Sequence, residues 1–383
     1  MQHGNFYNMK QGFVTLMVAI LGGLLFKLVH IPVPWLLGPM VTMVIVTNTL
    51  KRQFVWHVSI RNIGMMVIGY VIGLSMTASA LQDMVKQLPS MILMTLLLLL
   101  LSAGIAYVIS KVSSQDYNTS LLASMPGGLT QIVILAEETE GINLAIVTVT
   151  QVMRLMLIII AMPLLVMLPV FKDGSDGVNT PLQMEPSSVS MFPNIIVFAV
   201  VGIVLTVVGV KIKFPTAHLL APMLGTMLLQ ISGVKGPELP ELLTNIAQLM
   251  IGTHIGLMLN ANQLPGKART ISLAFISGIM LVFGSVLLSF LLTMLHPISS
   301  ATGLLSMAPG GMDQMSIIAH AIGADLSTVS GYQVFRTLVI FFALPPFIKW
   351  FFSYTEERKK KKYTIQRRQI EQERQRREAW THK

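Results

Sequence analysis

Long apolar stretches fill almost the whole chain between residues 12 and 352, and polar residues interrupt them only briefly. A membrane-spanning helix needs about 20 mostly apolar residues to cross a hydrocarbon core of about 30 Å. The first half contains six apolar stretches, at residues 12–30, 34–50, 61–79, 88–110, 119–137 and 142–170. The pattern predicts an all-α polytopic membrane protein with no soluble domain between its spans.

The apolar pattern occurs twice, at a nearly constant offset. "PVPWLLGPM" (32–40) aligns with "PTAHLLAPM" (215–223), and "MPGGLTQ" (125–131) aligns with "APGGMDQ" (308–314), both 183 residues apart. "QVMRL" (151–155) aligns with "QVFRT" (333–337) at an offset of 182. Shared Gly, Gln and Arg in one register predict two membrane repeats. The predicted divisions are repeat 1 at 1–170, a polar linker at 171–192, repeat 2 at 193–352 and a basic tail at 353–383.

The fifth stretch of each half carries Pro-Gly-Gly, which breaks a helix. Such a break leaves backbone groups unpaired, and hydrocarbon does not tolerate them unless protein or a water-filled cavity receives them. If this stretch crosses the membrane, the protein has twelve spans and parallel halves. If it enters and returns, each half has about five transmembrane helices plus a broken, re-entrant helix, and the second half is inverted.

Loop charges favour the inverted arrangement, because Lys and Arg in short loops stay on the cytoplasmic side. The twelve-span arrangement exports four basic residues that the inverted one keeps inside, namely Lys211, Lys213, Lys267 and Arg269. We therefore predict inverted-topology repeats, with the N- and C-termini in the cytoplasm and the linker outside.

Broken helices that meet near the midplane are a recurrent design of secondary transporters. After each Pro-Gly-Gly the chain resumes as an apolar segment, so free N–H groups and a positive dipole end favour an anion there. A close contact between glycine-rich helices is the structural alternative. The residues predicted to bind substrate at the two motifs are Gly127, Gly128, Gln131, Gly310, Gly311 and Gln314.

A Gln and an Arg follow each motif on the sixth span: Gln151 with Arg154, and Gln333 with Arg336. Their spacing of three residues places each pair on one helix face. An arginine at this depth costs at least ~2.5 kcal/mol. We predict that these four residues bind an anionic substrate or close the hairpins onto it, while the alternative is a structural pairing with a carbonyl or with Asp313.

Asp313 is the main difference between the two motifs, since its repeat mate is Thr130. A buried carboxylate near a cation such as Arg336 is suited to exchange a proton or Na⁺. We predict that Asp313 and Thr130 form the ion-coupling position, with a plain ion pair as the alternative.

Composition narrows the chemistry. Only 11% of residues are charged and none is cysteine, whereas soluble domains carry roughly 25% charged residues. The histidines are scattered, so we expect no metal site, no cofactor and no catalytic residue. No Gly-x-x-x-x-Gly-Lys-Ser/Thr sequence is present, so an ion gradient or a partner would drive transport.

The net charge of +10 resides largely in the tail, where residues 355–383 hold 11 Lys or Arg against 5 Glu. Such a cluster suits anionic lipid at the cytoplasmic face, at about 1 kcal/mol per basic residue. A solvated tail that only fixes topology is the alternative. We expect no nucleic-acid partner, because no reading module is present.

The two "PGGxxQ" segments, each followed by "QVxR", together with "LLGPM" and "LLAPM", resemble the AbrB family of bacterial membrane proteins. The resemblance implies a duplicated domain in the bacterial cytoplasmic membrane and a permease-like activity. Members are often labelled ammonia monooxygenases, but an oxygenase needs converging metal ligands that this sequence lacks. We predict a secondary transporter of a small, anionic solute driven by H⁺ or Na⁺, compatible with a homo-oligomer. The alternatives are a regulatory or sensory membrane protein and, least favoured, the oxygenase.

Overall fold

The computed structural model describes residues 2–50, 54–113, 115–127, 129–137, 139, 141–172, 191–258 and 268–348, and this part of the chain is all helical. Six helices are long and apolar enough to cross a membrane by length and composition: α1, α3, α4, α7, α9 and α12. Three shorter helices, α2, α10 and α15, are also apolar. The predicted all-α polytopic membrane fold is confirmed at this level.

The helices of the first half are α1 (Gln2–Leu28), α2 (Pro34–Leu50), α3 (Val58–Ser75), α4 (Ala78–Ser113), α5 (Tyr117–Ser124), α6 (Leu129–Glu137), α7 (Leu144–Val166) and α8 (Pro169–Lys172). Those of the second half are α9 (Met191–Lys211), α10 (Ala217–Ile231), α11 (Glu241–Met258), α12 (Ala268–Leu295), α13 (Ser300–Met307), α14 (Met312–Ile322) and α15 (Leu326–Phe342). In both halves the fifth apolar stretch forms two short helices instead of one. Most of the predicted linker, residues 173–190, and the tail lie outside the described residues.

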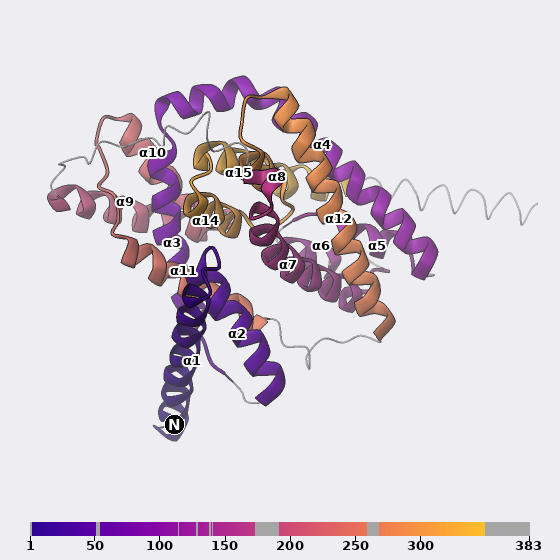
Figure 1. The fold of residues 1–383 in the computed structure, drawn as a ribbon, viewed down its shortest axis with the longest axis horizontal. Coiled ribbons are helices and arrows are strands. Elements are labelled where there is room, and N and C mark those ends of the chain that lie inside the picture. The colour runs from indigo at the N-terminus through magenta and orange to yellow at the C-terminus, as the bar shows by residue number, and fades with distance from the viewer. Residues whose placement is uncertain are drawn as a thin grey trace, which may run out of the picture.

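The helices sort into two groups by their contacts. The first helix group contains α1, α2, α3, α9, α10 and α11, and the hairpin group contains α4 to α7 and α12 to α15. In Figure 1, α1 and α2 lie at the bottom and α9 and α10 at the left, while α4, α5, α6 and α12 lie to the right. Helix α3 connects the groups, because it packs on α10 and α11 on one side and on α14 and α15 on the other.

Glycines bring helices of opposite halves into backbone contact. A Cβ on Gly69 of α3 would lie 2.4 Å from the carbonyl oxygen of Leu219 on α10, and a Cβ on Gly252 of α11 would lie 2.2 Å from that of Leu36 on α2. The second contact reproduces the first at the offset of 183, with the halves exchanged. The first helix group is therefore held together by two equivalent crossings between the halves.

Replacing Gly252 by alanine is expected to lower the free energy of unfolding by about 1–3 kcal/mol, because backbone atoms must move to admit the new methyl group. Thermal unfolding of the purified protein measures the loss. Gly104→Ala is the matched control: no atom lies within 4 Å of a Cβ there, so it should be neutral or stabilise the helix by up to about 1 kcal/mol. Equal melting temperatures for the two variants would show that the crossing is loose.

The largest buried apolar cluster joins the two groups. It includes Leu36 and Leu219 from the first helix group and Ile158 and Met315 from the hairpin group. In contrast, α9 exposes apolar side chains such as Ile203 and Val207, which suits contact with lipid. Helix α14 lies in the interior, because its residues from Met312 to Ala319 are buried.

Candidate functional site

Each broken stretch folds back on itself. The first hairpin consists of α5 and α6, and the second hairpin consists of α13 and α14. Beyond α6, the Asn143 N–H donates to Thr119 Oγ1 at the start of α5, at 3.2 Å. Beyond α14, the Asp325 N–H donates to Thr302 Oγ1 near the start of α13, at 3.1 Å. In both cases the chain returns to the level at which the hairpin began, so neither pair of helices continues in one direction.

Gln151 and Arg154 of α7 bind the open end of α5. Gln151 Nε2 donates to the carbonyl oxygens of Leu122, Ala123 and Met125 at 3.0–3.1 Å. Arg154 donates to the Met125 carbonyl at 2.6 Å and to Gln151 Oε1 at 2.5 Å. A helix end leaves carbonyls without partners, and these two side chains supply the missing donors.

The second hairpin repeats the arrangement. Gln333 Nε2 donates to the carbonyl oxygens of Leu305 and Ala308, at 2.7 and 3.1 Å. Arg336 donates to the Gly310 carbonyl at 3.5 Å and to Gln333 Oε1. The Gln–Arg pair of each half is therefore a cap for the first helix of its own hairpin.

These contacts correspond to the structural alternative for the four residues. Arg154 and Arg336 are 3% and 6% exposed, and their guanidinium groups already bind protein oxygens. Direct binding of substrate by Gln151, Arg154, Gln333 and Arg336 stays a prediction. Closing of the hairpins onto a substrate stays a prediction as well, and what the side chains do here is fix the backbone at each Pro-Gly-Gly.

The two hairpin tips approach the opposite half of the protein. A Cβ on Gly127 would lie 3.1 Å from Ile340 of α15, and a Cβ on Gly310 would lie 3.0 Å from Ile158 of α7. Arg154 and Arg336 are also close enough to act on each other electrostatically. The tips of both hairpins thus meet the same pair of helices near the centre of the hairpin group.

The start of α14 carries its own acceptors. Gln314 Nε2 donates to Asp313 Oδ2 at 2.9 Å. A Cβ on Gly311 would lie 2.6 Å from Asp313 Oδ1 and even nearer to Gln314 Oε1. These oxygens suit a cation or a hydrogen-bond donor at this helix start better than the anion expected there.

The tip of the first hairpin is only partly described. Gly127 is half-buried, whereas Gly128 and the side chains of Thr130 and Gln131 lie outside the described residues. Their predicted roles stay predictions.

Asp313 has a charged neighbour that the sequence did not indicate. Arg61, in the first turn of α3, acts on it electrostatically, while a pairing of Asp313 with Arg336 stays a prediction. Arg61 acts on His218 of α10 and on His254 of α11 as well. Arg61 Nε is buried without a hydrogen-bond partner in the described part of the chain. This cluster joins the first helix group to the second hairpin.

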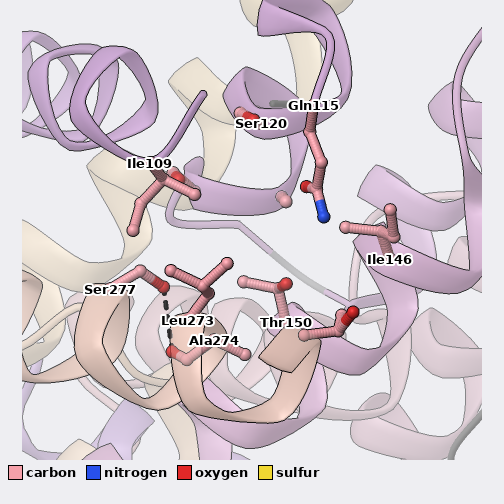
Figure 2. Close-up of a pocket in the computed structure, with 11 residues that line it drawn as sticks. Ile109, Gln115, Ser120, Ile146, Thr150, Leu273, Ala274 and Ser277 are labelled. Atoms are coloured by element: carbon pink, nitrogen blue, oxygen red, sulfur yellow. Dashed lines mark hydrogen bonds between the residues drawn. The ribbon is translucent and has the colours of Figure 1, made fainter. Parts of the chain in front are cut away.

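A cavity lies at the base of each hairpin. The first cavity has a volume of about 10 Å³ and lies where α4 ends and α7 and α12 begin. Figure 2 shows Gln115 reaching into it between Ser120 and Ile146, opposite Thr150. The second cavity, of about 370 Å³, lies where α4 and α15 begin and α12 ends, and includes Asp325. The second hairpin therefore has the more open base.

Comparison with known proteins identifies the family. The family model described as "Transition state regulatory protein AbrB" matches residues 35–352, which is most of the chain. The chain belongs to the AbrB family. The resemblance predicted from the repeated motifs is therefore confirmed, and the hairpins and their Gln–Arg caps lie within the matched region.

Two similar proteins align with nearly the whole chain. "Uncharacterized protein YhjN" of Bacillus subtilis (strain 168) is 26% identical over 94% of this chain and 97% of the relative. "Putative regulator AbrB" of Escherichia coli (strain K12) is 28% identical over 87% of this chain and 94% of the relative. The similarity thus extends over both halves and not over one repeat alone.

Sequence reasoning missed the Arg61 cluster, although a signal was present. At the offset of 183, Arg61 aligns with Thr244, His218 with Trp35 and His254 with Val71. Each of these three ionisable residues therefore aligns with a residue that cannot ionise, and the same is true of Asp313 and Thr130. Asp313 was selected because the repeats differ in charge at its position, and the same criterion would have selected the other three.

Proposed function

We propose that this AbrB family protein is a secondary transporter of a small, anionic solute, coupled to H⁺ or Na⁺, with the solute held between the two Pro-Gly-Gly hairpins. The observation that carries the proposal is the pair of hairpins, each broken at Pro-Gly-Gly and capped by a buried Gln and Arg. Backbone breaks inside a membrane are tolerated where they line a cavity or bind protein, and transporters use them to contact solutes.

Inverted topology is part of the proposal. The equivalent glycine crossings, in which α3 packs on α10 and α11 packs on α2, support the duplication. The inversion is supported by loop charges, which favour cytoplasmic termini and an external linker. In this arrangement the first hairpin enters from the cytoplasmic face and the second from the outer face of the bacterial cytoplasmic membrane.

The coupling ion is assigned to Asp313. This carboxylate is 7% exposed and lies beside the Gln314 Oε1 atom, which has no hydrogen-bond donor in the described residues. Thr130 at the equivalent position has no charge. The asymmetry gives the second hairpin a cation site that the first hairpin lacks.

Uptake into proteoliposomes tests the function. A panel of small carboxylates and phosphate esters is presented under an inward H⁺ gradient, an inward Na⁺ gradient or neither. We expect at least one anion to accumulate under one gradient only. Asp313→Asn should abolish accumulation but allow exchange, because a neutral side chain no longer takes up the coupling cation. Lys211→Gln, an exposed change on the proposed cytoplasmic side, is the matched control. Gradient-driven uptake retained in Asp313→Asn would contradict the assignment.

A regulatory role is the second candidate, because the family description and one relative's name use that word. The basic tail at 353–383 would then dock a partner, or anionic lipid. Deleting residues 355–383 separates the two candidates, since a transporter core should keep its flux without the tail.

A further inference from the structure

The cluster of Arg61, His218, His254 and Asp313 lies where the first helix group meets the second hairpin. The four residues come from α3, α10, α11 and α14, and α3 packs against each of the other three helices. Arg61 is the common member, because it acts electrostatically on the other three. The cluster therefore contains one guanidinium group, two imidazole rings and one carboxylate.

Packing does not explain the cluster. At the equivalent positions of the duplicated sequence stand Thr244, Trp35, Val71 and Thr130, none of which ionises in the physiological range. The crossing of α3 with α10 is repeated there between α11 and α2. This crossing therefore forms without ionisable residues in one copy, so its packing alone does not require Arg61 and His218 in the other.

The charges of the cluster are not paired with one another. No ion pair joins Arg61 to Asp313 within the described residues, although Lys86 and Asp83 form one elsewhere. Arg61 Nε and Gln314 Oε1 are both buried without partners in the part of the chain that the structure describes. A buried polar atom without a partner costs about 1–3 kcal/mol. Arg61 Nε on α3 and Gln314 Oε1 on α14, two helices in contact, are thus a donor and an acceptor left available to a polar ligand.

Resting on the proposed transport function, we propose that Arg61, His218 and His254 bind the oxyanion group of the solute, a carboxylate or a phosphate, and that Asp313 competes with it for Arg61. A guanidinium is suited to bind an oxyanion through two parallel hydrogen bonds. Two anions share one guanidinium poorly at low dielectric, because they repel each other. Once H⁺ or Na⁺ neutralises Asp313, Arg61 is free for the solute.

This competition couples the two ligands. A cation that binds Asp313 raises the affinity for the anion, and by linkage the anion raises the affinity for the cation by the same factor. The cluster would thereby make anion transport depend on the coupling cation. It also moves the anion site away from Arg154 and Arg336, whose guanidinium groups bind carbonyls.

Cysteine chemistry tests the proposal directly, because the chain contains no cysteine. His218→Cys serves as the reporter, since it is half-buried and leaves Arg61 and His254 in place. The purified protein in detergent is labelled with an anionic methanethiosulfonate (sulfonatoethyl) and with a cationic one (trimethylammonioethyl). The ratio of the two rates reports the local charge without any need for transport.

We expect Arg61→Gln to lower the ratio of anionic to cationic labelling about threefold or more, and Asp313→Asn to raise it by a similar factor. Arg61→Lys should keep the ratio within about twofold, as should the remote charge control Lys111→Gln, because α4 does not pack on α3, α10 or α11 among the main helix contacts of the described residues. Succinate or inorganic phosphate should slow anionic labelling when Arg61 is present but not in Arg61→Gln, and the more effective of the two identifies the oxyanion class.

The proposal is overturned if the ratio is insensitive to both Arg61→Gln and Asp313→Asn, if the reporter does not react, or if neither anion protects it at high millimolar concentration. If Arg61→Gln does not elute as a folded protein, Asp313→Asn and Arg61→Lys decide the same question. A charge-sensitive ratio without gradient-driven uptake would reject the transport function but keep the anion site. Gradient-driven uptake together with a labelling ratio that is insensitive to these substitutions would keep the transport function but reject the anion site.

Discussion

Replacing Arg336 by alanine is expected to lower the free energy of unfolding by about 3–5 kcal/mol, because buried polar groups that have lost their partner are strongly destabilising. Arg336 is 6% exposed and binds the Gly310 carbonyl and Gln333 Oε1. Its loss leaves these acceptors unpaired and frees the backbone at the second Pro-Gly-Gly. Arg154→Ala should behave alike, since Arg154 binds the Met125 carbonyl at 2.6 Å.

The measurement is thermal unfolding of the purified protein without solute, so that a role in binding alone does not enter. Thr337→Ala is the matched control on the same helix, because Thr337 Oγ1 makes only a local bond to the Gln333 carbonyl at 2.7 Å. That change should cost about 1 kcal/mol or less. If Arg336→Ala melts with the control and loses only its affinity for solute, the cap is not what Arg336 provides.

The hairpins could be predicted from the sequence because their cause is local. Pro126 and Pro309 lack an N–H, and the glycines that follow allow a sharp change of direction. The constant offset then showed that the break is duplicated. Observed helix ends at Ser124 and Met307 agree with breaks at these motifs.

The targets of the Gln–Arg pairs could not be predicted in the same way. The spacing of three residues predicts that Gln151 and Arg154 lie on one helix face. It does not predict what that face contacts. Carbonyls left free at the end of α5 must bind donors inside a membrane, and a packed neighbouring helix is the nearest source. That requirement makes the capping role understandable once the hairpin is known.

The contact of Arg61 with the field of Asp313 could not be predicted from the sequence either, because it depends on tertiary packing. Arg336 is near in sequence, whereas Arg61 belongs to a helix more than two hundred residues earlier. Because Arg61 begins an apolar stretch, the sequence alone favours a loop charge over a buried one at this position. The structure places α3 against α14, and only this contact between helix groups brings Arg61 into the field of Asp313.

The central claim is that the two hairpins enter from opposite faces of the membrane, and the sidedness of single cysteines tests it most directly. Leu144→Cys marks the base of the first hairpin and Ala321→Cys marks the base of the second, and both positions are exposed. A membrane-impermeant maleimide is applied to right-side-out and to inverted membrane vesicles.

We expect Leu144→Cys to react only in inverted vesicles, from the cytoplasmic face, and Ala321→Cys to react only in right-side-out vesicles. Labelling after solubilisation in detergent is the control that both cysteines are reactive. Labelling of the two cysteines from the same face would contradict the inverted arrangement, and with it the solute site between the hairpins.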